Sequence, residues 1–207
     1  MSNRNNIMSR NLMAILRGVL PHEVVAVGEQ LLQAGIYQIE VPLNSPNALQ
    51  SIANLQKSLG NHASVGAGTV LSVADVKAVQ THGGQFIVSP NCNIDVIKAT
   101  KDMDMMSYPG VFTPTECLAA LTNGADLLKL FPAFLLGVNG FKAIQSVLPS
   151  NAQCYAVGGI GGTDFAEWRD AGIAGFGLAS NLYKPGDSPE IVASKAKILV
   201  TAWDDTL

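Results

Sequence analysis

Short apolar runs with a preference for β-structure recur along the chain roughly every 20 to 25 residues, and most alternate with stretches of helical periodicity. Eight such runs stand out, at residues 13–17, 37–41, 64–67, 85–89, 105–109, 127–131, 154–157 and 175–178. Repeated strand–helix units favour a parallel sheet, and no proline- or serine-rich linker divides them. The sequence therefore predicts an α/β protein of one domain, a (β/α)8 TIM barrel over residues 12–207.

An open doubly wound sheet is the alternative architecture. It would place a Gly-x-Gly-x-x-Gly turn after the first strand, where the chain has LRGV at residues 16–19. We therefore prefer the barrel, in which catalytic groups lie at the carboxyl ends of the strands. Among the helices, Thr113 and Glu116 flank Pro114 in the pattern of a capped helix start.

The composition narrows the class of protein. With 48% hydrophobic and 14% charged residues, the 207-residue chain can bury a sizeable core. The formal net charge is -3 and basic residues do not cluster, so we expect no nucleic-acid partner. Residues 1–11 form a polar N-terminal segment without the apolar core of a secretion signal, and no later stretch predicts a membrane span. We expect a cytoplasmic protein with no membrane partner.

The cysteines and histidines do not indicate a metal centre. Cys92, Cys117 and Cys154 are far apart, which fits neither a disulfide framework nor paired zinc ligands. The histidines, at positions 22, 62 and 82, form no His-Glu-x-x-His pair. We therefore expect no metal and no cofactor.

Lys129 lies in the run DLLKLFP at residues 126–132, which otherwise has the pattern of a buried strand. Alternation places it on the same face as Leu127 and Phe131. Burying an ammonium is costly, and desolvation favours the neutral amine, a nucleophile that can form a Schiff base with a carbonyl. The alternative is a lysine at a strand end whose head reaches water or pairs with a carboxylate.

Two other charged residues lie in or at the ends of apolar strands. Glu40 faces opposite to Ile39 and Val41, which points it into the barrel if those two pack against helices. A buried carboxylate there is a candidate proton shuttle, or else a structural partner of Arg17 or Lys129. Arg17 suits a substrate carboxylate and would lower the pKa of Lys129, although a surface arginine at a strand end is the plainer interpretation.

Glycine-rich turns are expected after the third, seventh and eighth strands, at residues 66–69, 158–162 and 177–180. Barrels often bind phosphate between the loops after strands seven and eight, where bare backbone N–H groups approach the anion closely. Either loop alone is weak evidence, because tight turns use glycine for positive φ in any case. Their joint position favours a phosphate site.

Several motifs occur together and in order: AILRG at 14–18, IEVPLNSP at 39–46, GAGTV at 66–70, SPN at 89–91, LKLFPA at 128–133 and VGGI at 157–160. As an ordered set they resemble the 2-keto-3-deoxy-6-phosphogluconate and -galactonate aldolases, from about residue 12 to the last helix. The ordered set is far more specific than any one of its motifs.

The resemblance implies a role for each matched residue. Lys129 would be the Schiff-base lysine and Glu40 the general acid/base. The pyruvate pocket would be lined by Thr69, Pro90 and Phe131, and the phosphate would be held by Gly158, Gly159 and the Ser180 loop. The resemblance also implies a homotrimer whose partner is a small phosphorylated keto-sugar acid.

Two positions depart from the phosphogluconate branch. After Glu40 that branch has Val-Thr-Leu-Arg, whereas this chain has VPLN at 41–44 and supplies an arginine at Arg17 instead. Before the glycine pair that branch has threonine, where this chain has Val157. Both changes resemble the 2-dehydro-3-deoxy-6-phosphogalactonate branch. The FLLGVN loop at 134–139 is unusually apolar, which leaves its phosphate contacts open.

The expected reaction is metal-independent class I cleavage of 2-dehydro-3-deoxy-6-phospho-D-galactonate to pyruvate and D-glyceraldehyde 3-phosphate, with Arg17 on the substrate carboxylate. The closest alternative is the same chemistry on the phosphogluconate epimer, or on both epimers. A phosphate-binding barrel isomerase or epimerase with Glu40 as base is a more distant alternative. A non-enzymatic ligand-binding barrel is a third.

Overall fold

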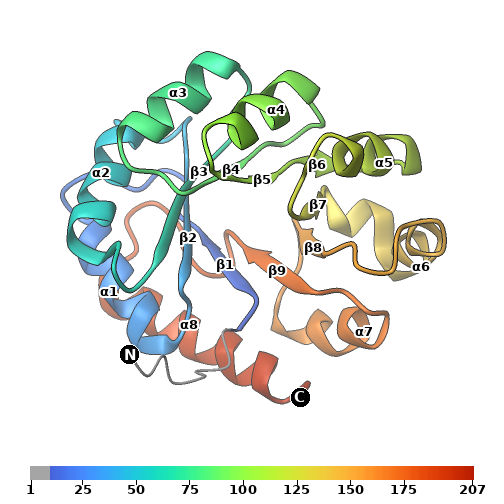
Figure 1. Ribbon diagram of the computed structural model, residues 1–207. Coiled ribbons are helices and arrows are strands. Elements are labelled where there is room, and N and C mark those ends of the chain that lie inside the picture. The colour runs from blue at the N-terminus through green and yellow to red at the C-terminus, as the bar shows by residue number, and fades with distance from the viewer. Residues whose placement is uncertain (1–9) are drawn as a thin grey trace, which may run out of the picture.

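The computed structural model describes residues 10–207 of the chain. Parallel strands form one sheet, ordered β5-β4-β3-β2-β1-β9-β8-β7-β6, with the helices outside it (Figure 1). The strands are β1 (Leu12–Ile15), β2 (Gln38–Pro42), β3 (Ser64–Gly68), β4 (Phe86–Val88), β5 (Met106–Tyr108), β6 (Gly110–Val111), β7 (Leu128–Leu130), β8 (Cys154–Val157) and β9 (Gly175–Leu178). The helices are α1 (Val24–Ala34), α2 (Ala48–Leu59), α3 (Val73–Thr81), α4 (Ile94–Asp102), α5 (Pro114–Thr122), α6 (Ala133–Gln145), the 3-10 helix η1 (Gly162–Asp164), α7 (Phe165–Asp170) and α8 (Pro189–Asp204). The predicted barrel is confirmed.

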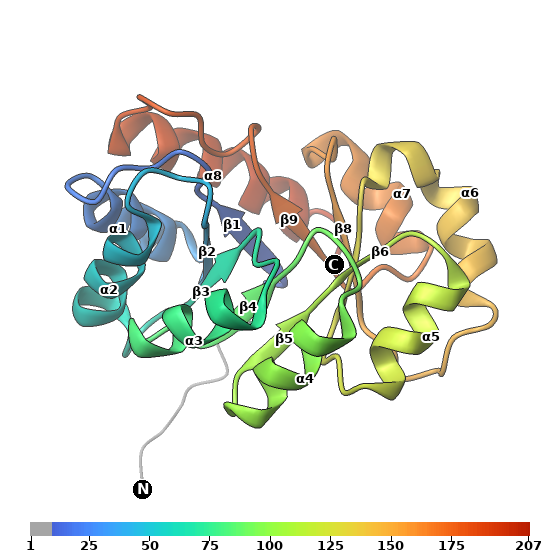
Figure 2. The same ribbon diagram turned by 90° about the horizontal axis from the view of Figure 1, so that it is seen from above.

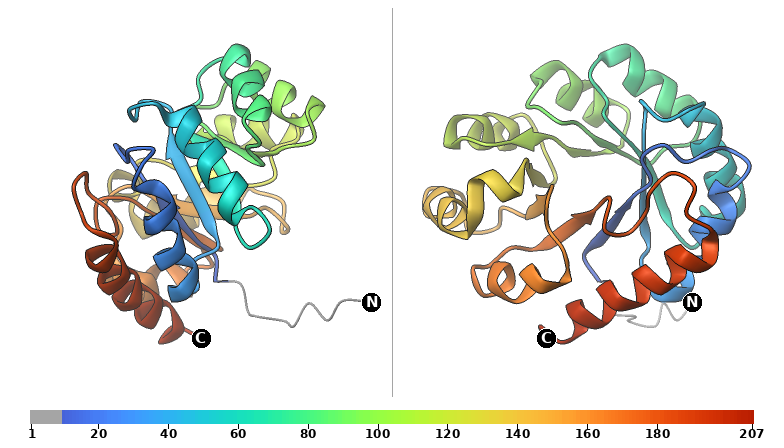
Figure 3. Two further views of the ribbon diagram at one scale, coloured as in Figure 1. Left: turned by 90° about the vertical axis from the view of Figure 1, so that its left-hand side faces the viewer. Right: turned by 180° about the vertical axis from the view of Figure 1, so that it is seen from behind.

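The barrel closes through a single run of sequence. β5 pairs with β4 at one end of the strand order, β6 pairs with β7 at the other, and only Pro109 separates β5 from β6. Proline has no N–H to donate, so the eight predicted runs appear as nine strands. Pairing still continues across the break, because the carbonyl of Pro109 accepts a hydrogen bond from the N–H of Lys129 at 2.9 Å. Figure 2 shows α4 and α5 beside this junction, and the right-hand view of Figure 3 shows the helices as an outer ring.

The first strand is shorter than the sequence predicts. β1 ends at Ile15, although the N–H of Leu16 still bonds the carbonyl of Glu40 at 2.9 Å. The chain then turns at Gly18, whose φ of 84° is strained for residues with a side chain. Arg17 therefore lies on the loop at the carboxyl end of the barrel and not within the strand.

The prediction of glycine-rich turns at 66–69 and 177–180 is wrong in part. Gly66 and Gly68 belong to β3, and Gly177 belongs to β9. A Cβ on Gly66 would overlap the ring of Phe86, and one on Gly177 would stand 2.8 Å from Cγ2 of Val157. These glycines make room for large side chains from neighbouring strands, which is a packing requirement that turn patterns do not reveal.

Capping boxes set where two of the helices begin. At α5, Oγ1 of Thr113 accepts a hydrogen bond from the N–H of Glu116 at 3.3 Å, and the carboxylate of Glu116 accepts one from the N–H of Thr113 at 2.9 Å. This start is the one that the sequence predicts. Ser72 and Asp75 form the same box at α3. A cap of this kind stabilises a helix by about 1 kcal/mol, and here it fixes the length of the loops that follow β3 and β6.

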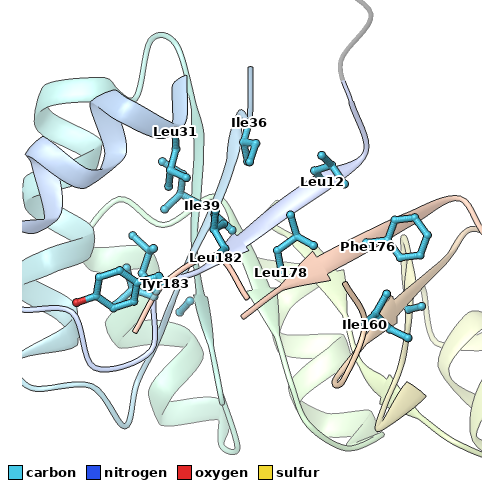
Figure 4. Packing of buried hydrophobic residues seen from close by; sticks show 14 of the residues in the cluster. Leu12, Leu31, Ile36, Ile39, Ile160, Phe176, Leu178, Leu182 and Tyr183 are labelled. Carbon is cyan, nitrogen blue, oxygen red and sulfur yellow. The ribbon is translucent and has the colours of Figure 1, made fainter. Parts of the chain in front are cut away.

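Apolar side chains pack in two layers. The larger layer lies between the sheet and the helices and includes Leu31 of α1, Ile39 of β2 and Leu178 of β9 (Figure 4). The smaller layer fills the interior of the barrel with Met13, Ile15, Phe86, Val88, Tyr108, Leu127, Tyr155 and Val157. Because side chains alternate along a strand, the outward position of Ile39 and Val41 turns Glu40 to the interior, as predicted.

The start of the described chain is tied to the last helix. Arg10 donates two hydrogen bonds to the carboxylate of Asp204, at 2.6 and 2.7 Å, and the amide of Asn11 donates to the carbonyl of Ala174 at 2.9 Å. Most of the expected N-terminal segment, residues 1–9 of 1–11, lies outside the described residues. Within residues 10–207 no helix is long and apolar enough to cross a membrane.

Candidate active site

Glu40 and Lys129 are the buried charged side chains in the part of the chain that the structure describes, with 1% and 5% of their surface exposed. Glu40 lies in β2 and Lys129 in β7, and both face the interior of the barrel. The interior is otherwise largely apolar, so each charge has lost most of its hydration. The sequence prediction of a buried lysine and a buried carboxylate within one barrel is therefore confirmed.

Lys129 has no direct ion-pair partner among residues 10–207. The ion pairs there join Arg10 to Asp204, Lys101 to Asp126 and Lys195 to Asp187. The Nζ atom of Lys129 stands 5.0 Å from the centre of the Phe131 ring, which places the amine beside an aromatic face, as alternation along the strand predicts. Burial lowers the pKa of Lys129 below its ordinary value, the carboxylate of Glu40 opposes this shift, and the guanidinium of Arg17 adds to it. The lowered pKa increases the fraction of neutral, nucleophilic amine.

Neither carboxylate oxygen of Glu40 has a hydrogen-bond partner among the described residues, although both oxygens are buried. Burial raises the pKa of Glu40, while the positive charges of Lys129 and Arg17 hold it down. A buried acceptor left without a hydrogen bond costs about 1–3 kcal/mol. If Glu40 had only a structural role, we would expect a donor to bond its carboxylate. A carboxylate in this state is ready to exchange protons with a bound molecule.

Arg17 reaches over the mouth of the barrel from the loop after β1. Its Nη1 donates a hydrogen bond to Oδ1 of Asn44 at 2.6 Å, and its Nη2 donates a longer one to Oγ1 of Thr69 at 3.5 Å. Asn44 follows β2 and Thr69 follows β3, so the guanidinium joins three neighbouring loops. The sequence indicated Arg17 and Thr69 but not Asn44. The only signal for Asn44 was its place in the motif after Glu40, where it replaces the arginine of the phosphogluconate branch.

A pocket of about 460 Å³ opens beside Arg17 and is lined by Ile15, Arg17, Gly18, Asn44, Ala179, Ser180, Tyr183, Lys184 and Pro185. Two cations and no carboxylate line it, which suits an anionic ligand. The hydroxyl of Tyr183 donates to Oε1 of Glu23 at 2.9 Å and so braces the loop after β9 against the start of α1. Figure 4 shows the phenolic oxygen of Tyr183 pointing away from the apolar cluster.

The loops after β8 and β9 are tied to each other and offer free amide groups. The side-chain amide of Asn181 donates to the carbonyl of Ile160 at 2.9 Å. Gly158 and Gly159 have φ values of 95° and 74°, and the turn that they form lies against Phe131 and Phe134. In residues 10–207 the backbone N–H groups of Gly159 and Ser180 donate no hydrogen bond to the protein. Unpaired N–H groups on adjoining loops are suitable donors for a phosphate.

The remaining predicted residues lie around the same end of the barrel. Val157 ends β8, is 3% exposed and belongs to the interior layer. Pro90 follows β4 and packs against Gly110 of β6. Phe131 follows β7, has 37% of its surface exposed, and its ring lies near the amine of Lys129. The structure thus brings the predicted set to one face of the barrel, where the strands end.

Within residues 10–207, the interior of a parallel barrel holds a buried lysine without an ion pair and a buried carboxylate without a hydrogen bond, the two groups that a lysine-dependent aldolase needs. The chain belongs to the aldolase family described as "KDPG and KHG aldolase", whose family model matches residues 4–183. This membership agrees with the resemblance that the ordered motifs indicate.

Two relatives and one solved structure align with this chain over most of their length. A protein of Rhizobium meliloti strain 1021 named probable 2-dehydro-3-deoxy-6-phosphogalactonate aldolase is 45% identical over 197 residues, covering 95% of this chain and 93% of its own. The 2-dehydro-3-deoxy-6-phosphogalactonate aldolase of Escherichia coli strain K12 is 42% identical over 196 residues, covering 95% and 96%. A solved structure described as native KDPGal aligns with a TM-score of 0.93 and 42% identity over 94% of this chain and 95% of that one.

Proposed function

We propose that the protein cleaves 2-dehydro-3-deoxy-6-phospho-D-galactonate to pyruvate and D-glyceraldehyde 3-phosphate through a Schiff base on Lys129. The observation that carries the proposal is the buried Nζ of Lys129, without an ion pair in the described chain, in a barrel interior that it shares with the unpaired carboxylate of Glu40. The names of the two relatives above support the choice of substrate.

The reaction follows from these two groups. The neutral amine of Lys129 adds to the C2 ketone, and loss of water from the carbinolamine gives an iminium. Glu40, directly or through a water, removes the proton of the C4 hydroxyl. The C3–C4 bond then breaks, its electron pair passes to the iminium to give an enamine, and the aldehyde departs. Glu40 returns the proton to C3, and hydrolysis of the new iminium releases pyruvate and restores Lys129.

The other residues of the site bind and orient the substrate. We assign Arg17 to the substrate carboxylate, because its guanidinium is held over the barrel mouth by Asn44. The pyruvate moiety would lie among Thr69, Pro90 and Phe131. The phosphate would bind at the backbone amides of Gly158 and Gly159 and at the Ser180 loop, so that remote binding energy aligns the reacting carbons.

The choice of epimer rests on Val157. A threonine at this position could donate a hydrogen bond near the aldehyde-derived oxygen, and valine cannot. We therefore propose that the phosphogalactonate epimer is preferred. Cleavage of the phosphogluconate epimer, alone or in addition, is the nearest alternative.

Borohydride trapping tests the proposed chemistry. Incubation with pyruvate and borohydride should add a reduced pyruvate adduct to the intact mass, and peptide mapping should place it on Lys129. Lys129→Met should give no adduct. An isomerase that uses Lys129 only as a charge would show no adduct in the unaltered protein either, and an adduct on another lysine would refute the assignment of Lys129.

We also propose that the protein assembles as a homotrimer, as its family resemblance implies. Phe112, Phe134 and Leu135 are exposed apolar side chains that a neighbouring subunit would cover, with 38%, 63% and 65% of their surface exposed. Light scattering after size exclusion should give three times the mass of one chain. A cytoplasmic location, expected from the sequence, stays a prediction.

A further inference from the structure

The side chain of Glu40 occupies the space that a Cβ atom on Gly68 would need. Such a Cβ would overlap Oε1 and Cδ of Glu40 and would stand 2.8 Å from its Cγ. Gly68 is the last residue of β3, which pairs in parallel with β2, the strand that carries Glu40. Any side chain at position 68 would therefore compete with the carboxylate for the same volume.

Backbone conformation gives no reason for a glycine at this position. Gly68 is paired in the sheet with Pro42, its carbonyl accepts a hydrogen bond from the N–H of Leu43 at 2.8 Å, and its φ is not in the positive range. The residue that does have a left-handed backbone is Thr69, with a φ of 56°. A β-branched residue thus takes the strained conformation while the glycine beside it is extended, the reverse of what backbone preferences favour. The requirement at position 68 is for empty volume.

Packing determines where the Glu40 carboxylate lies, because neither of its oxygens accepts a hydrogen bond in the described chain. The carboxylate is 1% exposed, so water does not orient it from outside. The nearby charges of Lys129 and Arg17 attract it but do not fix its orientation, since no ion pair or hydrogen bond joins it to either among residues 10–207. On the neighbouring strand β3, the gap at Gly68 admits the end of the side chain.

We infer that Gly68 is a positioning residue, whose missing side chain leaves the slot that holds the Glu40 carboxylate in its working orientation inside the barrel. This inference rests on the proposed function of Glu40 as the acid/base group. It goes beyond that function by naming what places the group. In the proposed reaction Gly68 transfers no proton and acts only through the carboxylate of Glu40.

Gly68→Ala tests the inference through the exchange of pyruvate methyl protons in deuterated water, a reaction that needs Glu40 but no phosphorylated substrate. The overlapping atoms belong to the free end of a flexible side chain, so we expect Glu40 to swing aside and the fold to persist. Exchange should fall by at least about 10-fold, since general acid/base catalysis contributes roughly 10²–10⁴-fold. The pyruvate adduct on Lys129 should still form with borohydride. Unchanged exchange in Gly68→Ala would overturn the inference.

Gly140→Ala is the matched control. Gly140 also has no positive φ, and its added Cβ would stand 2.8 Å from Cδ1 of Leu136, likewise the end of a flexible side chain, on α6 outside the sheet. This variant should keep the exchange rate of the unaltered protein. An equal loss in both alanine variants would mean that any crowded glycine affects exchange, and the specific role of Gly68 would be refuted.

A shorter carboxylate supplies the decisive comparison. Glu40→Asp should slow exchange in the unaltered background, because its carboxylate is one methylene short of the working position. In the Gly68→Ala background the same change withdraws Oε1, the most strongly overlapping atom, so the loss of exchange should be smaller than in the unaltered background. Loss by the same factor in both backgrounds would show that the two residues act independently and would overturn the inference.

Stability measurements cover the remaining outcomes. If Gly68→Ala lowers the melting temperature or fails to fold, then Glu40→Ala in the same chain should restore folding, because it empties the contested volume. Failure of that double variant to recover would refute the spatial conflict. If the unaltered protein forms no pyruvate adduct, the proposed function is wrong, yet this melting-temperature comparison still reports on Gly68 and Glu40 independently of activity.

Discussion

Replacing Lys129 by methionine should make the protein more stable while abolishing its proposed chemistry. Methionine matches the length of the lysine stem and needs no hydration, whereas the ammonium of Lys129 lies in an interior where 5% of the residue is exposed and no ion pair compensates it in the described chain. Replacing a lysine that is kept for function at a cost in stability should stabilise the protein. Replacing a lysine that forms a structural ion pair should destabilise it.

The size of the effect follows from burial and from the neighbouring carboxylate. Exchanging a whole buried ion pair for apolar groups of similar volume stabilises proteins by about 1–4 kcal/mol. Lys129→Met breaks no ion pair in the described chain, and we expect a gain of about 1–3 kcal/mol. Each kcal/mol raises the melting temperature of a chain of this size by about 2–4 °C. Part of the gain is offset because Glu40 loses the positive charge that holds its pKa down. Adding Glu40→Gln to Lys129→Met should recover that part.

The dependence on pH has a definite sign. The pKa of Lys129 is lowered from 10.5 in the folded protein, so between the lowered value and 10.5 the unfolded chain binds more protons than the folded one. The stability of the unaltered protein therefore rises with pH across that window. Lys129→Met lacks this dependence, and its advantage should shrink as the pH approaches 10.5. The raised pKa of Glu40 acts in the opposite sense, because stability falls as the pH rises from 4.5 toward that raised value.

Chemical unfolding at pH 7 and pH 10, followed by circular dichroism, measures these differences. Lys142→Met is the control, because Lys142 lies on the exposed face of α6 and its replacement should change stability by less than about 0.5 kcal/mol. A Lys129→Met protein that is less stable than the unaltered one at both pH values would refute the reasoning. Lys129 would then contribute to stability through a partner in the folded state.

Three further outcomes are expected. Val157→Thr should shift the ratio of kcat/KM for the two epimers toward phosphogluconate by roughly 1–3 kcal/mol, and a ratio that does not move would exclude Val157 as the discriminating residue. Asn44→Ala should raise the KM for pyruvate in proton exchange several-fold because it releases Arg17, and it should add nothing in an Arg17→Ala background; additive losses would separate the two residues. Cleavage should survive exhaustive chelation with EDTA, and recovery of lost activity by a divalent ion would favour a metal-dependent mechanism.

The fold could be predicted because the same strand–helix pattern repeats along the whole chain. Eight apolar runs separated by helical stretches admit few parallel arrangements, and the helix start at Thr113 was visible from three residues. The division of the fifth run into β5 and β6 at Pro109 depends on how the sheet closes around it. A proline in a short run indicates that a hydrogen bond is lost, but not whether pairing resumes on the other side.

The sequence predicts a site residue where a charged side chain lies within an otherwise apolar strand. Lys129 and Glu40 interrupt apolar strands, so their cost is apparent in the sequence itself. Asn44 was not predicted as a site residue, because an asparagine in a loop is ordinary and its bond to Arg17 joins segments 27 positions apart. Gly68 was interpreted as part of a turn. Its actual role depends on the volume of a side chain from the next strand, which no local pattern contains.

The interior of this small barrel follows one packing rule that links catalysis to specificity. Glycines on β3 and β9 face large side chains from the neighbouring strands, in the pairs Gly66–Phe86, Gly68–Glu40, Gly175–Tyr155 and Gly177–Val157. Two of these pairs fill space with apolar or aromatic groups, and the other two place the residues that we assign to proton transfer and to the choice of epimer. A barrel near the lower size limit of its fold has little interior volume, and the carboxylate of Glu40 enters it where the facing strand provides a gap. The positions of these glycines therefore help to determine which side chains fit inside the barrel, and through them which reaction the barrel can catalyse.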